Sequence, residues 1–478
     1  MAERELDPLR WKALTLVCAA FFMTVLDVSI VNVALPSIGS ALHFSRDSLQ
    51  WVVTAYAITF GGFLLLGGRA ADLIGRRRVF MVGVAVFTVA SFFCGLAWSE
   101  GVLIAARSVQ GLGAAIISPA ALSIVTTTFD EGAERNKALG IWGAIGGGGA
   151  AVGVLAGGVL TKYLGWEWIF FVNVPVGAVA FALCRRYVRE SRVERESQQD
   201  VLGAVLVTAG LALLVYAVSN APNHGWESGW TIWRLVVAVA LLVGFVVDQT
   251  RARDPLMPLR IFRVRTVAGA NACGLLLGAV VFSNFFILTL YVQEVLHYSA
   301  LKTGVTFVAT AGSAVLFAGL AQSLVTKVGA KSVMAAGFVA TVAGLVWYTQ
   351  IPVHGSFASD LLPGYLLIGF GLPFTFIPVS IAALAGVEPH EAGLASGLIN
   401  TAQQVGGAIG VAVASSVSES HFNTLVRSGH SFGEAFTSGS ALAFWVIVGI
   451  AVAGLVASLF LIRGGDLAQA GESASVIA

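Results

Sequence analysis

The stretch Gly68-Arg-Ala-Ala-Asp72-Leu-Ile-Gly75-Arg76-Arg77-Arg78 stands between two apolar runs, residues 50–68 and 79–98. Each run matches the length of about 20 mostly apolar residues that a helix needs to cross a bilayer. The basic segment between them predicts a helical hairpin whose turn lies on the side of the membrane where positively charged loops collect. Gly75 permits a tight turn there, and Asp72 can face a helix N-terminus or an arginine.

The composition of the whole chain agrees with a membrane protein. Of its 478 residues, 57% are hydrophobic and only 11% are charged, and the mean hydropathy is +0.85. An average globular domain is about 25% charged. The net charge of +2 gives no indication of nucleic-acid binding. The four cysteines lie in apolar runs without CxxC spacing, so neither a disulfide framework nor a metal site is expected.

The same length criterion predicts fourteen membrane spans and therefore an all-α integral membrane protein. The N-terminal segment is acidic before it becomes apolar, unlike a cleaved signal peptide, so the first span is expected to be retained. The spans are expected at residues 14–38, 50–68, 79–98, 101–127, 138–161, 168–184, 201–219, 235–249, 267–291, 303–326, 333–351, 361–385, 394–417 and 440–462.

Positive charge is unevenly distributed between the two sides that these spans define. With both termini on one side, that side holds 22 of the 28 Lys and Arg residues, and five lie on the other side. Cytoplasmic loops carry the excess of positive charge, which predicts that both termini are cytoplasmic. The shortest spans, 201–219 and 235–249, are joined by a loop expected to hold Trp226, Trp230 and Trp233 at the membrane interface.

The chain repeats itself at an offset of 254 residues. Leu42-His-Phe-Ser45 recurs as Leu296-His-Tyr-Ser299, and Gly75 falls on Gly329. Transporters are often built from internal repeats, although short matches also arise by chance in an apolar chain. The predicted domains are a six-helix lobe at 1–190, two inserted helices with linkers at 191–266, a second six-helix lobe at 267–465 and a cytoplasmic tail at 466–478.

The basic stretch resembles the GxxxD(R)xGRR signature of the major facilitator superfamily. The resemblance implies a fold of two six-helix lobes, here with two additional helices. It also implies that the signature residues latch the lobes together on the cytoplasmic side in the outward-open state. A simple positively charged membrane anchor is the alternative. The residues that would form the latch are Gly68, Asp72, Gly75, Arg76 and Arg77.

The predicted span 101–127 contains an arginine within the membrane. Its segment Arg107-Ser-Val-Gln110-Gly111-Leu-Gly113 resembles the family's RxxQGxG element. An arginine at the middle of a bilayer costs about 2.5–3.5 kcal/mol on insertion scales, so Arg107 is expected to face a cavity. The resemblance implies a part in proton transfer or in ordering the substrate cavity. A structural arginine bound by backbone carbonyls is the alternative.

The predicted span 138–161 is rich in glycine. Its residues Gly149, Gly153, Gly157 and Gly158 resemble the GxxxGPxxGG motif of antiporters, with Val154 in place of the proline. The same spacing is expected of any helix face that packs closely against another helix. The motif therefore leaves both an antiport role and a packing role open.

Three further segments resemble the fourteen-helix drug:proton antiporter branch of this superfamily. They are LDVSIVNVALP at 26–36, WEWIFFVNVPVG at 166–177 and GLASGLINTAQQ at 393–404. Relatives of this architecture also include lipid and antibiotic exporters, so the resemblance leaves the substrate open.

Motifs of several enzyme classes are missing from the sequence. It contains no GxxxxGK[ST] phosphate loop, no GxSxG elbow and no HExxH, and all seven histidines are expected in loops. We therefore expect a transporter driven by an ion gradient, not an enzyme, with no cofactor. Asp27 is the one acidic residue expected deep within a span, which makes it the leading candidate for proton coupling.

The sequence thus predicts an exporter that exchanges small amphipathic organic compounds for protons across the cytoplasmic membrane of a bacterium, working as a monomer. Asp27 would carry the proton, and Arg107 would be its electrostatic partner. A lipid or metabolite exporter of the same fold is the first alternative, and a membrane receptor or scaffold without transport is the second. Candidate polar residues of the substrate cavity are Asn32, Gln110, Asn271, Asn284, Glu294, Asn400, Gln403 and Gln404.

Overall fold

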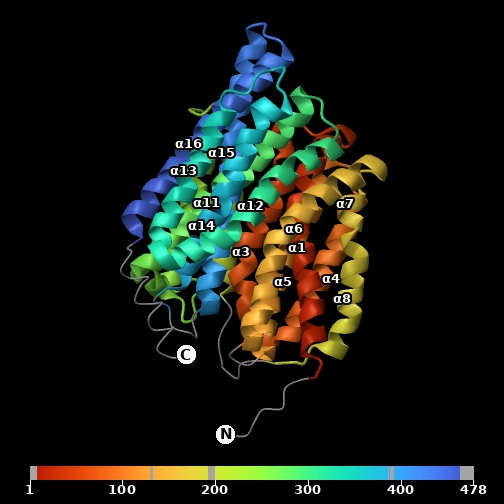
Figure 1. The fold of residues 1–478 in the computed structure, drawn as a ribbon, viewed down its shortest axis with the longest axis vertical. Helices are drawn as coiled ribbons and strands as arrows, with labels where there is room; N and C mark the ends of the chain where they lie inside the picture. Colours follow the sequence, from red (N-terminus) through yellow and green to blue (C-terminus); the bar gives the residue numbers. More distant parts are fainter. Residues whose placement is uncertain (1–7, 130–132, 192–199, 386, 388–391, 463–478) are drawn as a thin grey trace.

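The structure, a computed structural model, describes residues 8–129, 133–191, 200–385, 387 and 392–462. Within these ranges the regular elements are all helical (Figure 1). The predicted tail at 466–478 lies outside them. The first eight helices are α1 (Arg10–Ala41), α2 (Arg46–Leu49), α3 (Trp51–Ile74), α4 (Arg76–Gly95), α5 (Glu100–Thr128), α6 (Ala133–Tyr163), α7 (Trp168–Phe171) and α8 (Asn173–Tyr187).

The remaining helices follow in the same up-and-down manner. A pair, α9 (Val201–His224) and α10 (Gly229–Arg251), leads to the short 3-10 helix η1 (Leu259–Arg263). After it come α11 (Arg265–Leu290), η2 (Tyr291–Val295), α12 (Ala300–Val328), α13 (Ala330–Tyr348), η3 (Phe357–Leu361), α14 (Leu362–Leu384), α15 (Ala392–Arg427) and α16 (Phe432–Leu461).

The prediction of an all-helical membrane protein with fourteen spans is confirmed. In the described part of the chain, 12 helical segments are long and apolar enough to cross a membrane, with α7 and α8 together forming one of them. The glycine-rich α6 and the long α15 supply the other two predicted spans.

Several predicted boundaries are wrong at the ends of helices. α15 extends to Arg427 and α16 begins at Phe432, well outside the predicted spans, and α10 already begins at Gly229. Trp230 and Trp233 therefore lie in α10, not in a loop, and His421 lies inside α15, contrary to the expectation that all histidines are in loops. Hydropathy marks only the lipid-contacting length of a helix, whereas polar helical turns continue beyond it.

The helices pack into two groups, with the α9–α10 pair beside them. α1, α3, α4, α5, α6 and α8 contact one another, and α11 to α16 form the second group (Figure 1). α9 packs against both α3 and α15, and the two groups meet along α3–α15 and α6–α12. We call these groups the first and the second lobe.

The two copies of the sequence repeat share an unusual backbone conformation. His43 and His297 are the non-glycine residues with positive φ in the described chain, at 55° and 54°. Two positions later, Ser45 and Ser299 each cap a helix by accepting a backbone N–H. Gly75 and Gly329, the other matched pair, have φ values of 124° and 83°. A left-handed histidine is uncommon, so the recurrence supports duplication over chance similarity.

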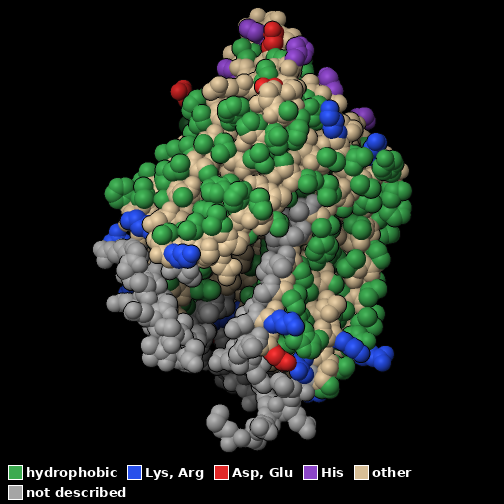
Figure 2. All heavy atoms as spheres, viewed as in Figure 1, with side chains coloured by type: hydrophobic (Ala, Val, Ile, Leu, Met, Phe, Trp, Pro, Cys, Tyr) green, Lys and Arg blue, Asp and Glu red, His purple; other side chains and the backbone are tan. Residues whose placement is uncertain are grey.

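We call the end of the bundle where α1 begins the basic end, because α1, α4 and α11 start there at Arg10, Arg76 and Arg265. The opposite end is called the far end. Figure 2 shows the molecule hollowed between the lobes towards the basic end. At the far end the lobes touch: Gln293 Nε2 donates to Val33 O at 2.8 Å, joining η2 to α1.

Candidate functional site

Asp27 lies at the centre of a buried polar cluster within the first lobe. Its side chain is completely buried, and it forms an ion pair with Arg107, in which Oδ2 lies 2.5 Å from Nη1. Its Oδ1 accepts hydrogen bonds from Gln110 Nε2 at 2.8 Å and from Asn173 Nδ2 at 3.1 Å. Helices α1, α5 and α8 therefore meet at this one carboxylate.

Ser91 of α4 adds a fourth helix to the cluster. Its hydroxyl oxygen accepts from Gln110 Nε2 at 2.6 Å and from Asn173 Nδ2 at 3.4 Å. Gln110 Oε1 in turn accepts from Arg107 Nη1 at 2.5 Å. Each side chain of the cluster has a partner, as buried polar groups require.

The positions of Arg107 and Gln110 follow from helix geometry and from glycine. The two residues are three apart, so they share one face of α5. A Cβ at Gly111 would lie 2.5 Å from Tyr56 O, and one at Gly113 would lie 2.6 Å from Phe87 N. Both distances are too short for a side chain, so these positions require glycine. The missing side chains allow the backbone of α5 to touch α3 and α4.

This close approach gives Arg107 two further partners on α3. Arg107 Nε donates to Val52 O at 2.9 Å, and Cζ lies 4.4 Å from the centre of the Tyr56 ring. A backbone carbonyl and an aromatic face both favour a cation. Arg107 is therefore bound both by an acid, Asp27, and by a backbone carbonyl, Val52 O, as expected of a structural arginine.

The glycines of α6 pack against α1 on either side of Asp27. A Cβ at Gly149 would lie 3.0 Å from Val25 Cγ1, one at Gly153 would lie 2.9 Å from Leu26 O, and one at Gly157 would lie 2.7 Å from Ile30 O. Gly158 instead approaches α12 of the second lobe, 2.9 Å from Ala300 O by the same measure. These contacts are those expected if the glycines serve helix packing.

The residues predicted to form the latch contact mainly the segment after α8. Arg76 N donates to Ser191 O at 2.9 Å, and Arg77 N donates to Glu190 Oε1 at 3.1 Å. The side chains of Arg77 and Arg78 lie 3.7 and 3.6 Å from Glu190 Oε2. Gly68 packs beside Pro119 of α5, and the side chain of Asp72 lies outside the described residues.

The remaining predicted polar residues do not join the Asp27 cluster. Asn32, Asn271 and Asn400 each donate to the carbonyl of their own helix four residues earlier. Asn284 Oδ1 and Gln404 Oε1 are buried without a hydrogen-bond partner among the described residues. The backbone of Gln403 contacts Gly278 of α11, and Glu294 lines a cavity at the far end.

Sequence reasoning missed two members of the cluster as site residues, Ser91 and Asn173, and also the Tyr56 ring that packs on Arg107. Ser91 and Asn173 are polar residues within apolar spans, which is the signal that could have marked them. It also missed Glu419, because the predicted span ended at residue 417, whereas α15 continues past it.

Comparisons with known proteins give one consistent result. The family model described as "Major Facilitator Superfamily" matches residues 17–411. The chain is 40% identical over 458 residues to a puromycin resistance protein of Streptomyces alboniger, covering 95% of this chain and 91% of that protein. It is 42% identical over 406 residues to a cephamycin export protein of Amycolatopsis lactamdurans, covering 84% and 83%.

Solved transporter structures share the fold. A bacterial homologue of the human lysosomal transporter Spinster, solved inward-facing and unoccupied, superimposes with a TM-score of 0.67 at 14% identity, covering 97% of this chain and 98% of that one. The POT family transporter PepTSo gives a TM-score of 0.66 at 17% identity, covering 93% of this chain and 98% of that one.

Proposed function

Because the chain belongs to the Major Facilitator Superfamily, we propose that this multi-pass membrane transporter exports amphipathic organic compounds in exchange for protons. The named relatives are antibiotic resistance and export proteins, which favours antibiotics and related drugs as substrates. We expect the basic end to face the cytoplasm, with both termini on that side, because cytoplasmic segments carry the excess of Lys and Arg. The two lobes at 1–190 and 267–465 would rock against each other.

The observation that carries the proton-coupling part is the buried carboxylate of Asp27 with its three donors. Ionised, Asp27 is stabilised by the positive charge of Arg107 and by two amide N–H donors. When Asp27 binds a proton, its charge disappears and one of its oxygens becomes a donor, so one of the three donors must turn away. Protonation therefore loosens the connection of α1 to α5 and α8.

α1 is well placed to transmit this change to the second lobe. Six residues after Asp27, Val33 O accepts the hydrogen bond from Gln293 at the far-end contact between the lobes. Between these two points α1 packs on the glycines of α6, whose next glycine contacts α12. A shift of α1 would thus bias the lobe contacts at the far end, as coupled exchange requires.

Gradient-driven uptake into proteoliposomes tests this function. The compounds are puromycin, a cephamycin, a fluorescent dye and a labelled lipid, which together separate drug export from lipid export. A pH gradient should drive uphill accumulation by the wild type. Asp27→Asn should abolish this accumulation while still permitting exchange down a substrate gradient, because the shape remains and the titration is lost.

Glu227→Gln is the matched control, since Glu227 is an exposed acid in the loop between α9 and α10. This variant should transport as the wild type does. Uphill accumulation by Asp27→Asn with an unchanged pH dependence would show that the proton is carried elsewhere.

A further inference from the structure

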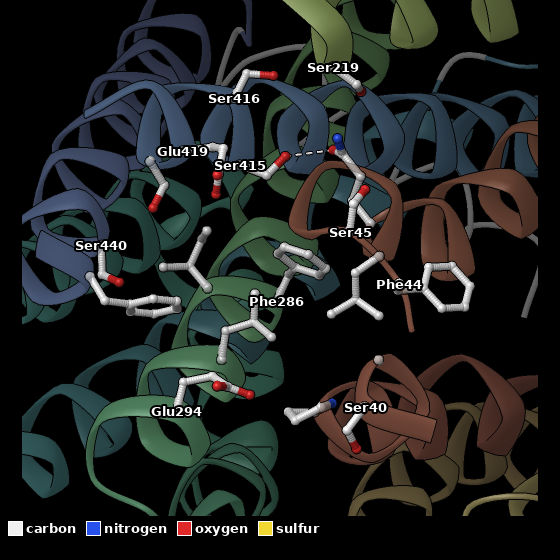
Figure 3. Close-up of a pocket in the computed structure, with 18 residues that line it drawn as sticks. Ser40, Phe44, Ser45, Ser219, Phe286, Glu294, Ser415, Ser416, Glu419 and Ser440 are labelled. Carbon is white, nitrogen blue, oxygen red and sulfur yellow. Dashed lines mark hydrogen bonds between the residues drawn. The ribbon is translucent and has the colours of Figure 1, made fainter. Parts of the chain in front are cut away.

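A second polar site lies at the far end of the molecule, between the two lobes. Here a partly open cavity of about 280 Å³ is lined by residues of α1, the α1–α3 connection, α9, α11, η2, α15 and α16 (Figure 3). Its lining begins at Pro36, nine residues after Asp27, which is about 13 Å further along α1. The cavity is therefore separate from the Asp27 cluster.

The lining of this cavity suits an organic cation. Glu294 of η2 and Glu419 of α15 line it, and none of its 18 described lining residues is a lysine or an arginine. Phe44, Phe286 and Phe436 supply aromatic surface to the same space. Carboxylates attract a positively charged group, and aromatic side chains accommodate both a cation and an apolar body.

Two buried hydroxyl groups are present without partners at this cavity. Ser219 of α9 and Ser440 of α16 are each 1% exposed, and neither hydroxyl has a hydrogen-bond partner among the described residues. Both residues line the cavity (Figure 3). An unpartnered buried hydroxyl destabilises the protein, and a ligand that supplies an N–H donor would relieve that cost.

We propose that the far-end cavity binds organic monocations with an aromatic body, above all protonated amines, and that a bound cation holds the two lobes together at this end. Glu294 and Glu419 each accept one of the three N–H donors of the ammonium group, and Ser440, on the same side of the cavity, accepts the third. Ser219 borders the opposite side, where the rest of the compound lies (Figure 3). The volume lies just below the range of about 300–1,000 Å³ that is usual for ligand pockets. It therefore fits a small amine or one end of a larger compound.

The bound cation would act on the conformation because both lobes contribute to the cavity. Ser415 Oγ of α15 donates to Gln50 Oε1 at the start of α3, at 2.5 Å, and this hydrogen bond crosses from the second lobe to the first (Figure 3). If the lobes separate at this end, the residues that line the cavity move apart and the binding site is lost. A ligand that binds only the closed arrangement stabilises it.

The direction of entry follows from the exposed residues of the lining. Ser40 and Ser45 are exposed at the surface of the far end, whereas the other polar lining residues lie deeper. Provided that the proposed function and its orientation hold, the cavity opens on the side to which compounds are exported. Exported amine would then slow its own export as it accumulates outside.

The binding site can be tested without transport. Isothermal titration of 2-phenylethylammonium into the full chain in lipid nanodiscs is compared with 2-phenylethanol, its neutral analogue. The ammonium should bind saturably, and the alcohol should bind about tenfold more weakly or worse, the effect of losing a charge-assisted interaction. Glu294→Gln/Glu419→Gln should lose a similar factor, and Glu227→Gln should bind as the wild type does.

Ser219→Leu is the second variant, because it fills the cavity from α9 and leaves both acids in place. It should also weaken binding of the ammonium. Saturable binding that is equal in the wild type, the double variant and Ser219→Leu would overturn the proposal, as would the absence of binding to the wild type. The titration does not depend on transport. If the protein binds the ammonium but does not export compounds, the proposed function is refuted and the binding site is not.

Discussion

The ion pair between Asp27 and Arg107 should show strong energetic coupling in a double-mutant cycle. The pair is short, at 2.5 Å, and both side chains are almost fully buried. Water therefore cannot replace either partner. Removing one partner of such a pair leaves an uncompensated charge and destabilises a protein by about 3–5 kcal/mol.

The two single substitutions should differ in severity. Asp27→Leu leaves the guanidinium of Arg107, which cannot lose its proton, with Val52 O, Gln110 Oε1 and the Tyr56 ring. Arg107→Met leaves Asp27 with the N–H donors of Gln110 and Asn173, and the acid can also become neutral by binding a proton. Asp27→Leu should therefore reach the upper part of that range and Arg107→Met the lower part.

The double variant Asp27→Leu/Arg107→Met should be more stable than Asp27→Leu alone. It removes both charges together, and replacing a complete buried ion pair by apolar residues is often neutral or stabilising. Gln110 and Asn173 keep Ser91 as a partner. The measurement is denaturant-induced unfolding in nanodiscs at neutral pH. If the double variant loses the sum of the two single losses, the pair is not coupled and the electrostatic argument fails.

Two further substitutions test how the helices and the cluster are positioned. Gly157→Leu should destabilise the protein by about 1–3 kcal/mol, because its side chain would push α6 away from Ile30 O on α1, whereas Gly449→Leu has open space around it and should be neutral in the same unfolding assay. For Asp200, burial acts to raise the pKa, but hydrogen bonds from Gln249 and the backbone of Gly203 outweigh it and lower the pKa. Its stabilisation of the start of α9 is therefore present at neutral pH and lost as pH falls through that lowered pKa, below the ordinary value of about 3.9. Hydrogen exchange of the Gly203 amide should accelerate relative to neighbouring amides at acidic pH in the wild type, and Asp200→Ala should show the fast behaviour at all pH values; a protected Gly203 amide in that variant would contradict the assignment.

The sequence by itself determined the membrane class, the fourteen spans and the family, because these depend on local properties. A span is recognised from the apolar character of about 20 consecutive residues, without any knowledge of its neighbours. The internal repeat was also visible as a local match, and the structure adds that its two histidines, His43 and His297, both have positive φ. Asp27 and Arg107 stood out singly because a charge within an apolar run is costly wherever it points.

Only the tertiary structure decided which residues meet. Asp27 and Asn173 are 146 positions apart, and Ser91 resembles any other serine in an apolar run until α4 is placed beside α5 and α8. The far-end cavity depends even more on packing, since Glu294, Glu419 and Ser219 come from three separate helices. Hydropathy states that a residue lies within the membrane, but the direction in which its side chain points is set by helix rotation and close packing, which glycines such as Gly111 and Gly157 permit.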